Sequence, residues 1–577
     1  MFKKRLSLLL SLVLCFTALL SMPFSAQAAT KLTLSGSSTA YVGCTSTLTV
    51  KVNNKKVSAS KCNFSSSNRS VATVSNSGVV TAAKKGSTTI TAKLKSNGKV
   101  YAKFKITVKS NTLKTPLKTI SFAKGCSNTL VIYNGSKRVY GGDVTFSSSD
   151  KTVATVSSGG VVSAKAKGSA VIKVSSKKSK GMYISIKINV RDTKSFVLTP
   201  TSTPLNGSFI NYSGYNSTTK MYYTIRSYLE YFEKHPGCTL TFRAGQYNVC
   251  NVLYIPSNTT IRLLDGTTIK KIYDTKSSAI SASATLVAFC APSKAAVSGA
   301  YSKYNGVHNS KLIGYGNAKI DMAGQPASKL CCAVVMCHNK SISIEGIAFS
   351  NISYGHFIEM DASKDVKVNN CSFSNHSDPN KKSAGECINL DTPDKNTGGF
   401  TQTWTSYDCT ANYNVSITNC NFNKVQRAIG THQYSENQYH TNVTIDNCSI
   451  NECMYGGIYM MNWKNAVITN NTFNGVGKDT KGNVINPDYL QSNRVLFMAG
   501  CSTVNISGNS FSNCYQVGAI SSHQANGYEP IYNQLTDDEL YTMCYTNTCG
   551  ENVDLACFKA YQNWDGNSAA YRVFNIS

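Results

Sequence analysis

The chain is 577 residues long, which is too long for one ordinary domain, so two to four domains are expected. Lys and Arg outnumber Asp and Glu by 59 to 29, for a formal net charge of +30. Residues 31–200 hold 29 basic and three acidic residues, a net charge of +26, whereas residues 201–577 hold 27 and 26. The composition therefore excludes a uniformly basic protein and predicts a basic N-terminal part joined to a nearly neutral C-terminal part.

The N-terminus has the three parts of a secretory signal peptide: a basic start, a long apolar run and a small-residue site at Ala26–Ala28. We therefore assign residues 1–28 to a signal peptide and exclude them from fold prediction. No later apolar run approaches the roughly 20 residues that a membrane-spanning helix needs. These features predict a secreted, extracellular, cell-wall-associated monomer without a membrane span.

Secretion from the cell limits the partners and the cysteine chemistry that we expect. Nucleic acid is excluded as a target, and the positive field of residues 31–200 favours long polyanions, either anionic cell-wall polymers or uronate polysaccharides. The alternative is a soluble spacer with Lys on its exposed strand faces. Twenty of the 21 cysteines remain after signal removal, none in a CxxC pair, which argues against structural zinc.

An internal repeat occupies the basic region. The segment FSSSNRSVATVSNSGVVTAAKKGSTTITA (64–92) returns as FSSSDKTVATVSSGGVVSAKAKGSAVIKV (146–174), and its short Val/Ile/Thr runs between Gly, Asn and Ser predict β-sandwiches. The shared SxVATVSxxGVVxAxxKG core resembles the group-2 bacterial immunoglobulin-like repeat. This resemblance implies two such domains, over 31–110 and 115–191, with a spacing or adhesive role. Neither copy contains a catalytic constellation.

A Pro/Ser/Thr-rich stretch at 192–207 predicts a linker before a second region, residues 208–577. In MYYTIRSYLEYFEKHPG, the residues Ile225, Leu229 and Phe232 fall on one helical face, which a Pro-Gly pair ends. Short strands follow directly. A lone helix in this place predicts a cap that shields the open edge of the first solenoid coil.

One phrase recurs through the second region, in SISIEGIAF (341–349), DVKVNNCSF (365–373), NVSITNCNF (414–422), NVTIDNCSI (442–450), NAVITNNTF (465–473) and TVNISGNSF (503–511). A base period of roughly 23–24 residues, lengthened by insertions, predicts a β-solenoid with one coil per repeat. Cys371, Cys420 and Cys448 share one column and are predicted to form an inward ladder. Successive coils lie about 4.8 Å apart, which is within the Cα separation of a disulfide, so disulfides between these cysteines are an alternative.

The phrase resembles the coil repeat of the pectin-lyase-like superfamily, which implies a right-handed parallel β-helix over 208–577 with a C-terminal cap. That superfamily includes lyases, hydrolases, epimerases and non-enzymatic adhesins, so the resemblance implies the fold and leaves the reaction open. The whole chain is predicted to be all-β: two immunoglobulin-like β-sandwiches, then the β-helix with a short N-terminal capping helix.

A second strand precedes each phrase, and its aligned residues are Ile358, Ile388, Ile429, Ile458 and Leu496. If this column faces inward, the residues one and three positions later face outward. The first outward column is Glu359, Asn389, Gly430, Tyr459 and Phe497. The second outward column is Asp361, Asp391, His432, Met461 and Ala499. Two positions before the aligned residues, at the strand corner, come His356, Glu386, Arg427, Gly456 and Arg494.

Asp361, Asp391 and His432 are therefore predicted to lie on one outer face and to form a catalytic centre. Carboxylates stacked about 5 Å apart repel, so one pKa is expected to rise, giving an acid–base pair or a Ca²⁺ site. In a lyase or epimerase, His or Tyr removes the proton beside a uronate carboxylate, whose charge an Arg neutralises. The predicted catalytic helpers are Glu359, Tyr459, Arg427 and His440. Calcium held by Asp361 and Asp391 is the one cofactor expected, and a cofactor-free site is the alternative.

Long loops on neighbouring coils are expected to form the walls of a cleft in which aromatic rings stack on sugars. The predicted substrate-binding residues are Glu386, Asp394, Trp404, Tyr407, Tyr434, Glu436 and Arg494. A structural ion pair is the alternative for Glu386 with Arg427, and an ordinary polar strand face is the alternative for the outward columns.

The sequence lacks the NTD, GHG and RIK motifs of polygalacturonases and the WxDH and RxPxxR motifs of pectate lyases, so no family within the superfamily is assigned. The predicted function is cleavage or modification of an acidic polysaccharide by the β-helix, with the basic repeats for attachment or spacing. The alternatives are a non-catalytic, glycan-binding adhesin and a phage-like or host-facing glycan depolymerase.

Overall fold

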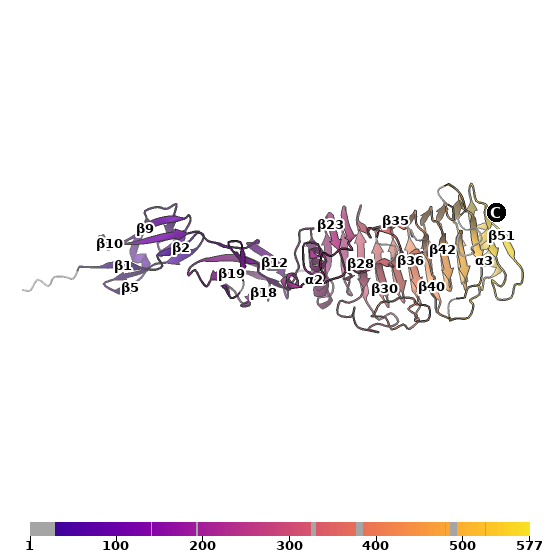
Figure 1. Cartoon of the computed structure of the whole chain (residues 1–577), viewed down its shortest axis with the longest axis horizontal. Coiled ribbons are helices and arrows are strands. Elements are labelled where there is room, and N and C mark those ends of the chain that lie inside the picture. The colour runs from indigo at the N-terminus through magenta and orange to yellow at the C-terminus, as the bar shows by residue number, and fades with distance from the viewer. Residues whose placement is uncertain are drawn as a thin grey trace, which may run out of the picture. The chain divides into compact units, whose positions relative to one another are not determined.

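The structure is a computed structural model that describes residues 29–139, 141–191, 194–324, 330–376, 385–478, 481–484, 493–524 and 527–577. The predicted signal peptide, residues 1–28, lies outside this part of the chain. The described chain is nearly all β and contains two immunoglobulin-like domains and a parallel β-helix, as predicted (Figure 1).

The two immunoglobulin-like repeats have identical strand connections. The sheets of the first are β1 (Leu32–Ser35), β4 (Thr49–Val52) and β5 (Lys55–Val57); β2 (Thr39–Tyr41), β10 (Asn97–Lys109), β9 (Gly86–Leu94) and β6 (Cys62–Ser66); and β3 (Thr45–Thr47), β8 (Val79–Ala82) and β7 (Ala72–Val74). The sheets of the second are β11 (Leu113–Lys114), β14 (Ile132–Asn134) and β15 (Lys137–Val139); β12 (Thr119–Ala123), β20 (Tyr183–Arg191), β19 (Gly168–Ser176) and β16 (Val144–Ser148); and β13 (Ser127–Thr129), β18 (Val161–Ala164) and β17 (Ala154–Val156). The strands correspond one to one, so the sequence repeat is a repeat of the fold. A short 3₁₀ helix, η1 (Ala59–Lys61), follows β5.

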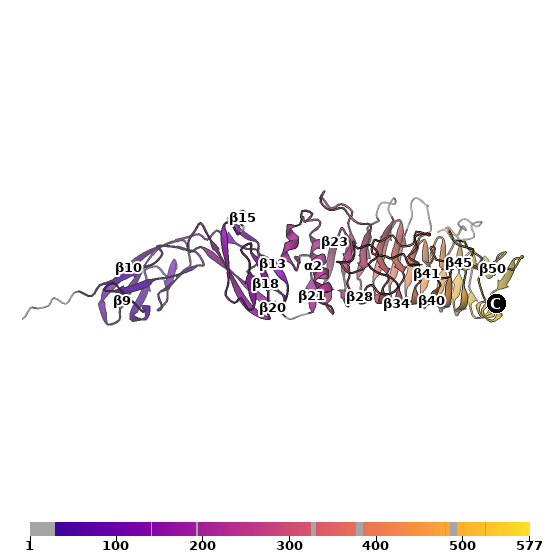
Figure 2. The same ribbon diagram turned by 90° about the horizontal axis from the view of Figure 1, so that it is seen from below.

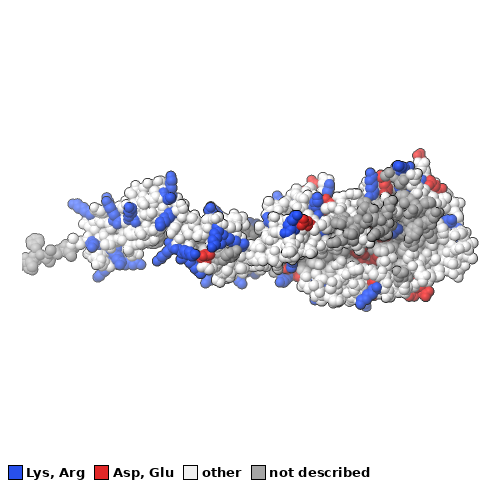
Figure 3. Space-filling view, in the orientation of Figure 1, with Lys and Arg blue, Asp and Glu red and all other residues white. Residues whose placement is uncertain are grey.

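Strand alternation places the Lys side chains of the repeats in solvent. In β10, Ile106 and Val108 are buried, whereas Lys103, Lys105 and Lys109 are exposed. Figure 3 shows basic side chains spread over the visible face of the repeats, with few acidic side chains among them. The predicted positive surface is therefore present on the folded domains.

The β-helix consists of three long sheets in which each strand pairs with its equivalent in the next coil. Sheet 1 contains, in spatial order, β21 (Ser195–Leu198), β22 (Thr239–Phe242), β25 (Thr260–Leu263), β28 (His308–Gly314), β31 (Lys340–Glu345), β34 (Lys364–Asn369), β37 (Tyr413–Thr418), β40 (His440–Asp446), β43 (Trp463–Thr469) and β46 (Ser502–Ser507). Sheet 2 contains β23 (Gly245–Val249), β26 (Thr267–Lys271), β29 (Lys319–Asp321), β32 (Ala348–Ile352), β35 (Ser372–His376), β38 (Asn421–Asn423), β41 (Ser449–Asn451), β44 (Thr472–Asn474), β47 (Ser510–Ser512) and β49 (Thr548–Cys549). Sheet 3 contains β24 (Leu253–Tyr254), β27 (Thr285–Phe289), β30 (Cys331–Cys337), β33 (Gly355–Asp361), β36 (Glu386–Asp391), β39 (Arg427–Gly430), β42 (Gly456–Met461), β45 (Arg494–Ala499), β48 (Gln516–Ile520), β50 (Leu555–Ala560) and the antiparallel β51 (Arg572–Asn575). Figure 2 shows the same succession of coils after a quarter turn.

The β-helix begins earlier than predicted. Strand β21 lies inside the predicted linker, 192–207, and pairs in parallel with β22. Its Phe196 and Leu198 are buried, so this short alternating segment already belongs to the first coil. A 3₁₀ helix, η2 (Gly207–Asn211), follows it. The linker prediction was wrong for these residues because a four-residue strand leaves little periodicity to detect.

Helices lie near both ends of the β-helix. Helix α2 (Lys220–Lys234) buries Ile225, Leu229 and Phe232 and packs on β23 and β24, as predicted for a cap. Helix α3 (Asp537–Tyr545) packs on β46 and β51 and starts with a capping box between Thr536 and Glu539. None of the helices in the described ranges is both long enough and apolar enough to span a bilayer.

Columns of like side chains fill the interior of the β-helix. The Phe349 and Phe373 rings are stacked at 5.1 Å, and the Phe373 and Phe422 rings at 4.8 Å. The predicted cysteine ladder is buried, and no disulfide joins any two of the cysteines that the structure describes. Asparagines continue that column: the Asn471 amide donates to Asn509 Oδ1 and the Asn509 amide to Asn547 Oδ1, both at 2.9 Å. In this column, the buried amide of one coil is therefore hydrogen-bonded to the amide of the next.

Ile429 tests the aligned column of sheet 3, because it is fully buried and pairs with Ile388 and Ile458. We expect Ile429→Asp to unfold the surrounding coils, since it buries an unpaired carboxylate at a cost of several kcal/mol. Ile429→Val should lower the free energy of unfolding by only about 0.5–1.5 kcal/mol. Urea unfolding followed by circular dichroism measures both. Equal effects of the two substitutions would contradict the inward assignment.

Candidate functional site

The register of sheet 3 brings the predicted outward columns together. Asp361 pairs with Asp391 and Glu359 with Asn389 between β33 and β36. The predicted stacking of two aspartates on consecutive coils is therefore present. The column does not continue to His432, because β39 ends at Gly430 and the chain leaves the sheet there.

The backbone after β39 turns around the Asp391 carboxylate. The N–H groups of His432 and Gln433 both donate to Asp391 Oδ1 at 3.0 Å. This turn directs the His432 ring back over the sheet, where Nδ1 lies 3.1 Å from Asn389 Oδ1 and 3.4 Å from Asp391 Oδ2. The His432 side chain is 39% exposed, unlike the buried groups around it.

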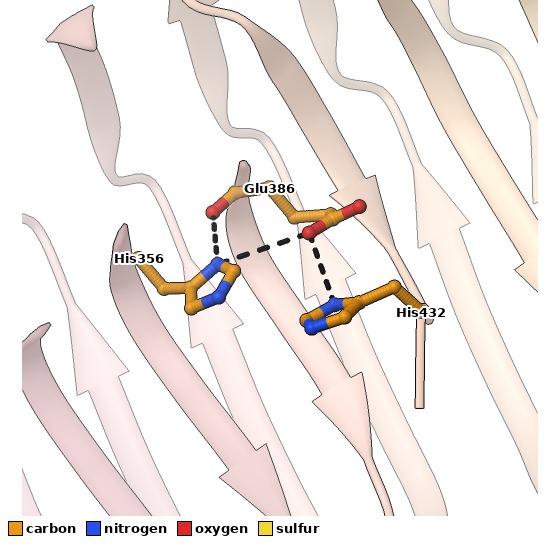
Figure 4. A group of neighbouring side chains, drawn as sticks. All are labelled: His356, Glu386 and His432. Atoms are coloured by element: carbon orange, nitrogen blue, oxygen red, sulfur yellow. Dashed lines mark hydrogen bonds and ion pairs between the residues drawn. The ribbon is translucent and has the colours of Figure 1, made fainter. Parts of the chain in front are cut away.

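Glu386 occupies the centre of this group, although only 1% of its side chain is exposed (Figure 4). Its Oε1 forms an ion pair with Arg427, which was the structural alternative predicted for these residues. Its Oε2 lies 3.3 Å from His432 Nδ1 and 3.8 Å from His356 Nδ1. The His356 ring also donates to the main-chain oxygen of Glu386 at 2.8 Å.

Opposite charges set the ionisation of the two central groups. Burial acts to raise the pKa of Glu386, but the cationic Arg427 and His432 and the ring of His356 outweigh it and hold the pKa below its usual range. Burial acts to lower the pKa of His432, but the carboxylates of Asp391 and Glu386 outweigh it and raise the pKa to about 10. The site therefore holds an ionised Glu386 beside a cationic His432.

Glu359 and Asp361 form the acidic side of the group. Burial, with the neighbouring carboxylates of Glu359 and Asp391, raises the pKa of Asp361 well above its usual range. Burial also raises the pKa of Glu359, with Asp391 adding to it and His356 opposing it. The predicted rise of one carboxyl pKa is therefore found at Asp361, with burial as its main cause. Because Asp361 is fully buried, it cannot reach a polymer as the predicted catalytic aspartate.

Two predicted catalytic helpers lie away from the exposed side of this group. His440 begins β40 in sheet 1, is fully buried, and accepts at Nδ1 from the Asn412 N–H at 3.1 Å. Burial lowers the pKa of His440 to about 3. Tyr459 is fully buried against Phe497, with the Arg427 guanidinium 3.6 Å from its ring centroid. Strand pairing and loop packing bury both side chains, so neither lies on the exposed side of the group with His432.

The aromatic residues predicted to stack on sugars pack against the protein. Trp404 is 1% exposed and covers Cys337 and Val335 on the outer face of sheet 3. Tyr434 is fully buried, and its hydroxyl lies 3.1 Å from His523 Nδ1. The predictions of a sugar contact were therefore wrong for both residues.

The remaining predicted substrate-binding residues lie around the group or apart from it. Asp394 is buried and accepts from Tyr528 and Ser435, and these hydrogen bonds lower its pKa although burial acts to raise it. Arg494 is 4% exposed, with its guanidinium 5.2 Å from the Tyr515 ring. Half-buried Tyr407 and exposed Glu436 both lie on loops. The Lys395 ammonium group lies over the Tyr407 ring, 5.5 Å from the ring centroid.

Two residues of the group were not selected from the sequence. His356 lies in the corner column, and its ring is 5.5 Å from the His432 ring. Asn389 lies in the first outward column, donates to Glu359 Oε1 at 3.0 Å and accepts from His432. The alignment that placed Glu386 and Glu359 in these two columns contained the signal for both. We define His356, Glu359, Glu386, Asn389, Asp391 and His432 as the His–carboxylate cluster.

The cluster brings acid, base and metal-ligand groups together. Nitrogen or oxygen atoms of His356, Glu386 and His432 all lie within 4.8 Å of one another, close enough to share a metal ion. Perturbed ionisation and an exposed imidazole mark it as a candidate functional site.

Comparison with known proteins agrees with the predicted architecture. Residues 28–104 and 107–186 match the bacterial immunoglobulin-like domain (group 2) family. No sequence among the curated proteins matches the chain. The chain thus contains two group-2 bacterial immunoglobulin-like domains followed by a parallel β-helix.

Several solved structures match parts of the chain at low sequence identity. One is PfbA, a surface adhesin of Streptococcus pneumoniae, at 16% identity over 62% of this chain and 82% of that chain, with a TM-score of 0.45. Another is the tailspike protein of E. coli bacteriophage HK620, at 13% identity over 59% and 56% of the two chains, with a TM-score of 0.40. Domains 4 and 5 of the S-layer protein SbsC share 23% identity over 28% of this chain and 97% of that chain, with a TM-score of 0.13.

The raised pKa of His432 makes a testable prediction for the metal-free protein. The pKa of His432 is about 10 in the folded protein, above the usual value of 6.5. The stability that the cationic ring contributes is therefore complete below about pH 6.5 and is lost as the pH rises through 10. Ring ¹⁵N shifts should show a cationic His432 at pH 8 and a neutral His440 at pH 5. Asp391→Asn should lower the pKa of His432. A wild-type His432 ring that titrates at its ordinary value would contradict the geometry.

Proposed function

We propose that the β-helix cleaves or chemically modifies an acidic polysaccharide at the His–carboxylate cluster. The observation that carries this proposal is the position of His432, which presents a partly exposed imidazole from an otherwise buried group of carboxylates. A cationic ring held by Asp391 and Glu386 keeps one orientation, which is what proton donation to a sugar oxygen requires.

The proposed roles follow from what each side chain contacts. His432 transfers the proton, because it alone in the cluster exposes more than a third of its side chain. Asp391 fixes the backbone turn that carries His432, and Glu386 faces its ring. The Arg427 ion pair keeps Glu386 charged, so Arg427 acts on the site through Glu386. Calcium at Asp361 and Asp391 remains a proposal for this face, separate from the proton transfer.

Removal of the imidazole tests this function. The mature protein is incubated with acidic and neutral polysaccharides, while reducing ends and the ultraviolet absorbance of unsaturated uronates are followed. We expect His432→Gln to lower the rate by about 100-fold or more, the usual contribution of an acid–base group. His308→Gln, which replaces an exposed histidine of sheet 1, is the matched control. Full activity in His432→Gln rejects the proposed role.

The second candidate function is a glycan-binding adhesin without catalysis. It is favoured by the burial of Glu386 and Asp391, whose charges are matched by Arg427 and His432 and which contribute to stability whether or not a substrate binds. Retention of a polysaccharide by the β-helix without any product would support this function over the enzyme.

We further propose that the protein acts outside the cell and that its basic repeats hold it on acidic polymers. The support is a net charge of +26 in residues 31–200, much of it on exposed strand faces such as Lys103 and Lys105 of β10. Attraction between exposed charges is screened by salt. Residues 30–191 should bind immobilised uronate polymer and elute as salt rises, while residues 192–577, which keep β21, should not. Salt-insensitive binding by both parts would contradict this proposal.

A further inference from the structure

Two imidazole rings and a carboxylate from three consecutive coils face one another in the cluster. His356 belongs to β33, Glu386 to β36, and His432 follows β39. Figure 4 shows Glu386 between the two rings, with one oxygen turned toward a nitrogen of each. The set of two histidines and one carboxylate is a frequent ligand set for divalent transition metals in proteins.

One of the distances equals that between two ligands of one metal ion, and the others are somewhat longer. Metal–nitrogen and metal–oxygen bonds of about 2.0–2.1 Å in tetrahedral geometry place neighbouring ligand atoms roughly 3.3–3.4 Å apart. Glu386 Oε2 lies 3.3 Å from His432 Nδ1 and 3.8 Å from His356 Nδ1. The three ligand atoms are mutually within 4.8 Å, so small side-chain rotations bring them onto one ion.

In metal sites, residues around the ligands usually orient them through hydrogen bonds, and the neighbours of these three residues are placed to do the same. Arg427 engages Glu386 Oε1, which leaves Oε2 for an ion. Glu359 Oε2 lies 3.5 Å from His356 Nε2. It is therefore placed to accept a hydrogen bond from the Nε2–H group when Nδ1 binds the metal. For this, His356 Nδ1 gives up its hydrogen bond to the main-chain oxygen of Glu386, and His432 Nδ1 gives up its hydrogen bond to Asn389 Oδ1. Both Nδ1 protons are released to solvent as the ion binds.

Asp391 lies beside His432, and the cluster is accessible from one side. Asp391 Oδ2 lies 3.4 Å from His432 Nδ1, while Oδ1 is fixed by two backbone N–H groups. His356 and Glu386 are 7% and 1% exposed at their side chains, whereas His432 is 39% exposed. The exposed side of His432 is therefore the entry path for an ion.

We propose that His356, Glu386 and His432 bind one divalent transition-metal ion of the zinc or manganese type. Two imidazole ligands favour such an ion over calcium, which prefers oxygen ligands throughout. This inference adds an ion to the cluster of the proposed function and rests on that function only because both use the same residues. Its test measures binding alone.

The test uses the untagged mature protein after treatment with a chelator. Isothermal titration with Zn²⁺ should give one site per chain, and Co²⁺ should give visible absorption without the thiolate band that cysteine ligation produces. His432→Gln lies on the exposed side and should keep the fold, as checked by circular dichroism. We expect this substitution and His356→Gln each to weaken Zn²⁺ binding at least 10-fold, while His308→Gln binds as the unaltered protein does.

Absence of a Zn²⁺ site, or equal affinity in the His432→Gln and unaltered proteins, would overturn the metal proposal. Tighter binding of Ca²⁺ than of Zn²⁺ would also overturn it. These outcomes are separate from those of the activity test. Metal binding without turnover of any polysaccharide rejects the proposed enzyme alone, whereas turnover in the chelated protein together with no Zn²⁺ binding rejects the metal site alone.

Discussion

The parallel hydrogen-bond ladder between successive coils is the constraint on which the β-helix depends. Each strand of the three sheets pairs with its equivalent one coil away, so each side chain lies on the same position of the neighbouring coil. Like residues therefore stack in columns, as the rings of Phe349, Phe373 and Phe422 do. Where a column changes from cysteine to asparagine, the amides of Asn471 and Asn509 bond along it.

The His–carboxylate cluster arises where this regularity is interrupted. Strand β39 stops at Gly430, and the backbone bends around Asp391 instead of continuing the ladder. Buried carboxylates are costly unless they are paired, and here Arg427 and His432 supply the matching charges. The charged groups that mark the candidate site are therefore also part of its folding, which is why enzyme and adhesin need to be distinguished by turnover.

Loops complete the separation between buried and accessible groups on sheet 3. Trp404 and Phe400 cover the coils around Cys337, and Tyr434 packs with Tyr459 and Phe497 further along. The His432 ring keeps its partial exposure between polar neighbours. The cluster thus presents one partly exposed imidazole on this face, whereas the aromatic side chains of the loops pack into the folded structure.

The sequence by itself determined the two repeats, the coil period and the register that pairs Asp361 with Asp391, because a stacked coil repeats its pattern of buried side chains locally. It also contained the three columns that supply the cluster, including the corner column of His356. Only the tertiary structure decided which outward groups stay accessible. The turn at His432, the burial of Asp361 and Trp404, and the place of His440 in sheet 1 depend on where strands end and loops dock. Those contacts join residues far apart in the chain, and no local periodicity encodes them.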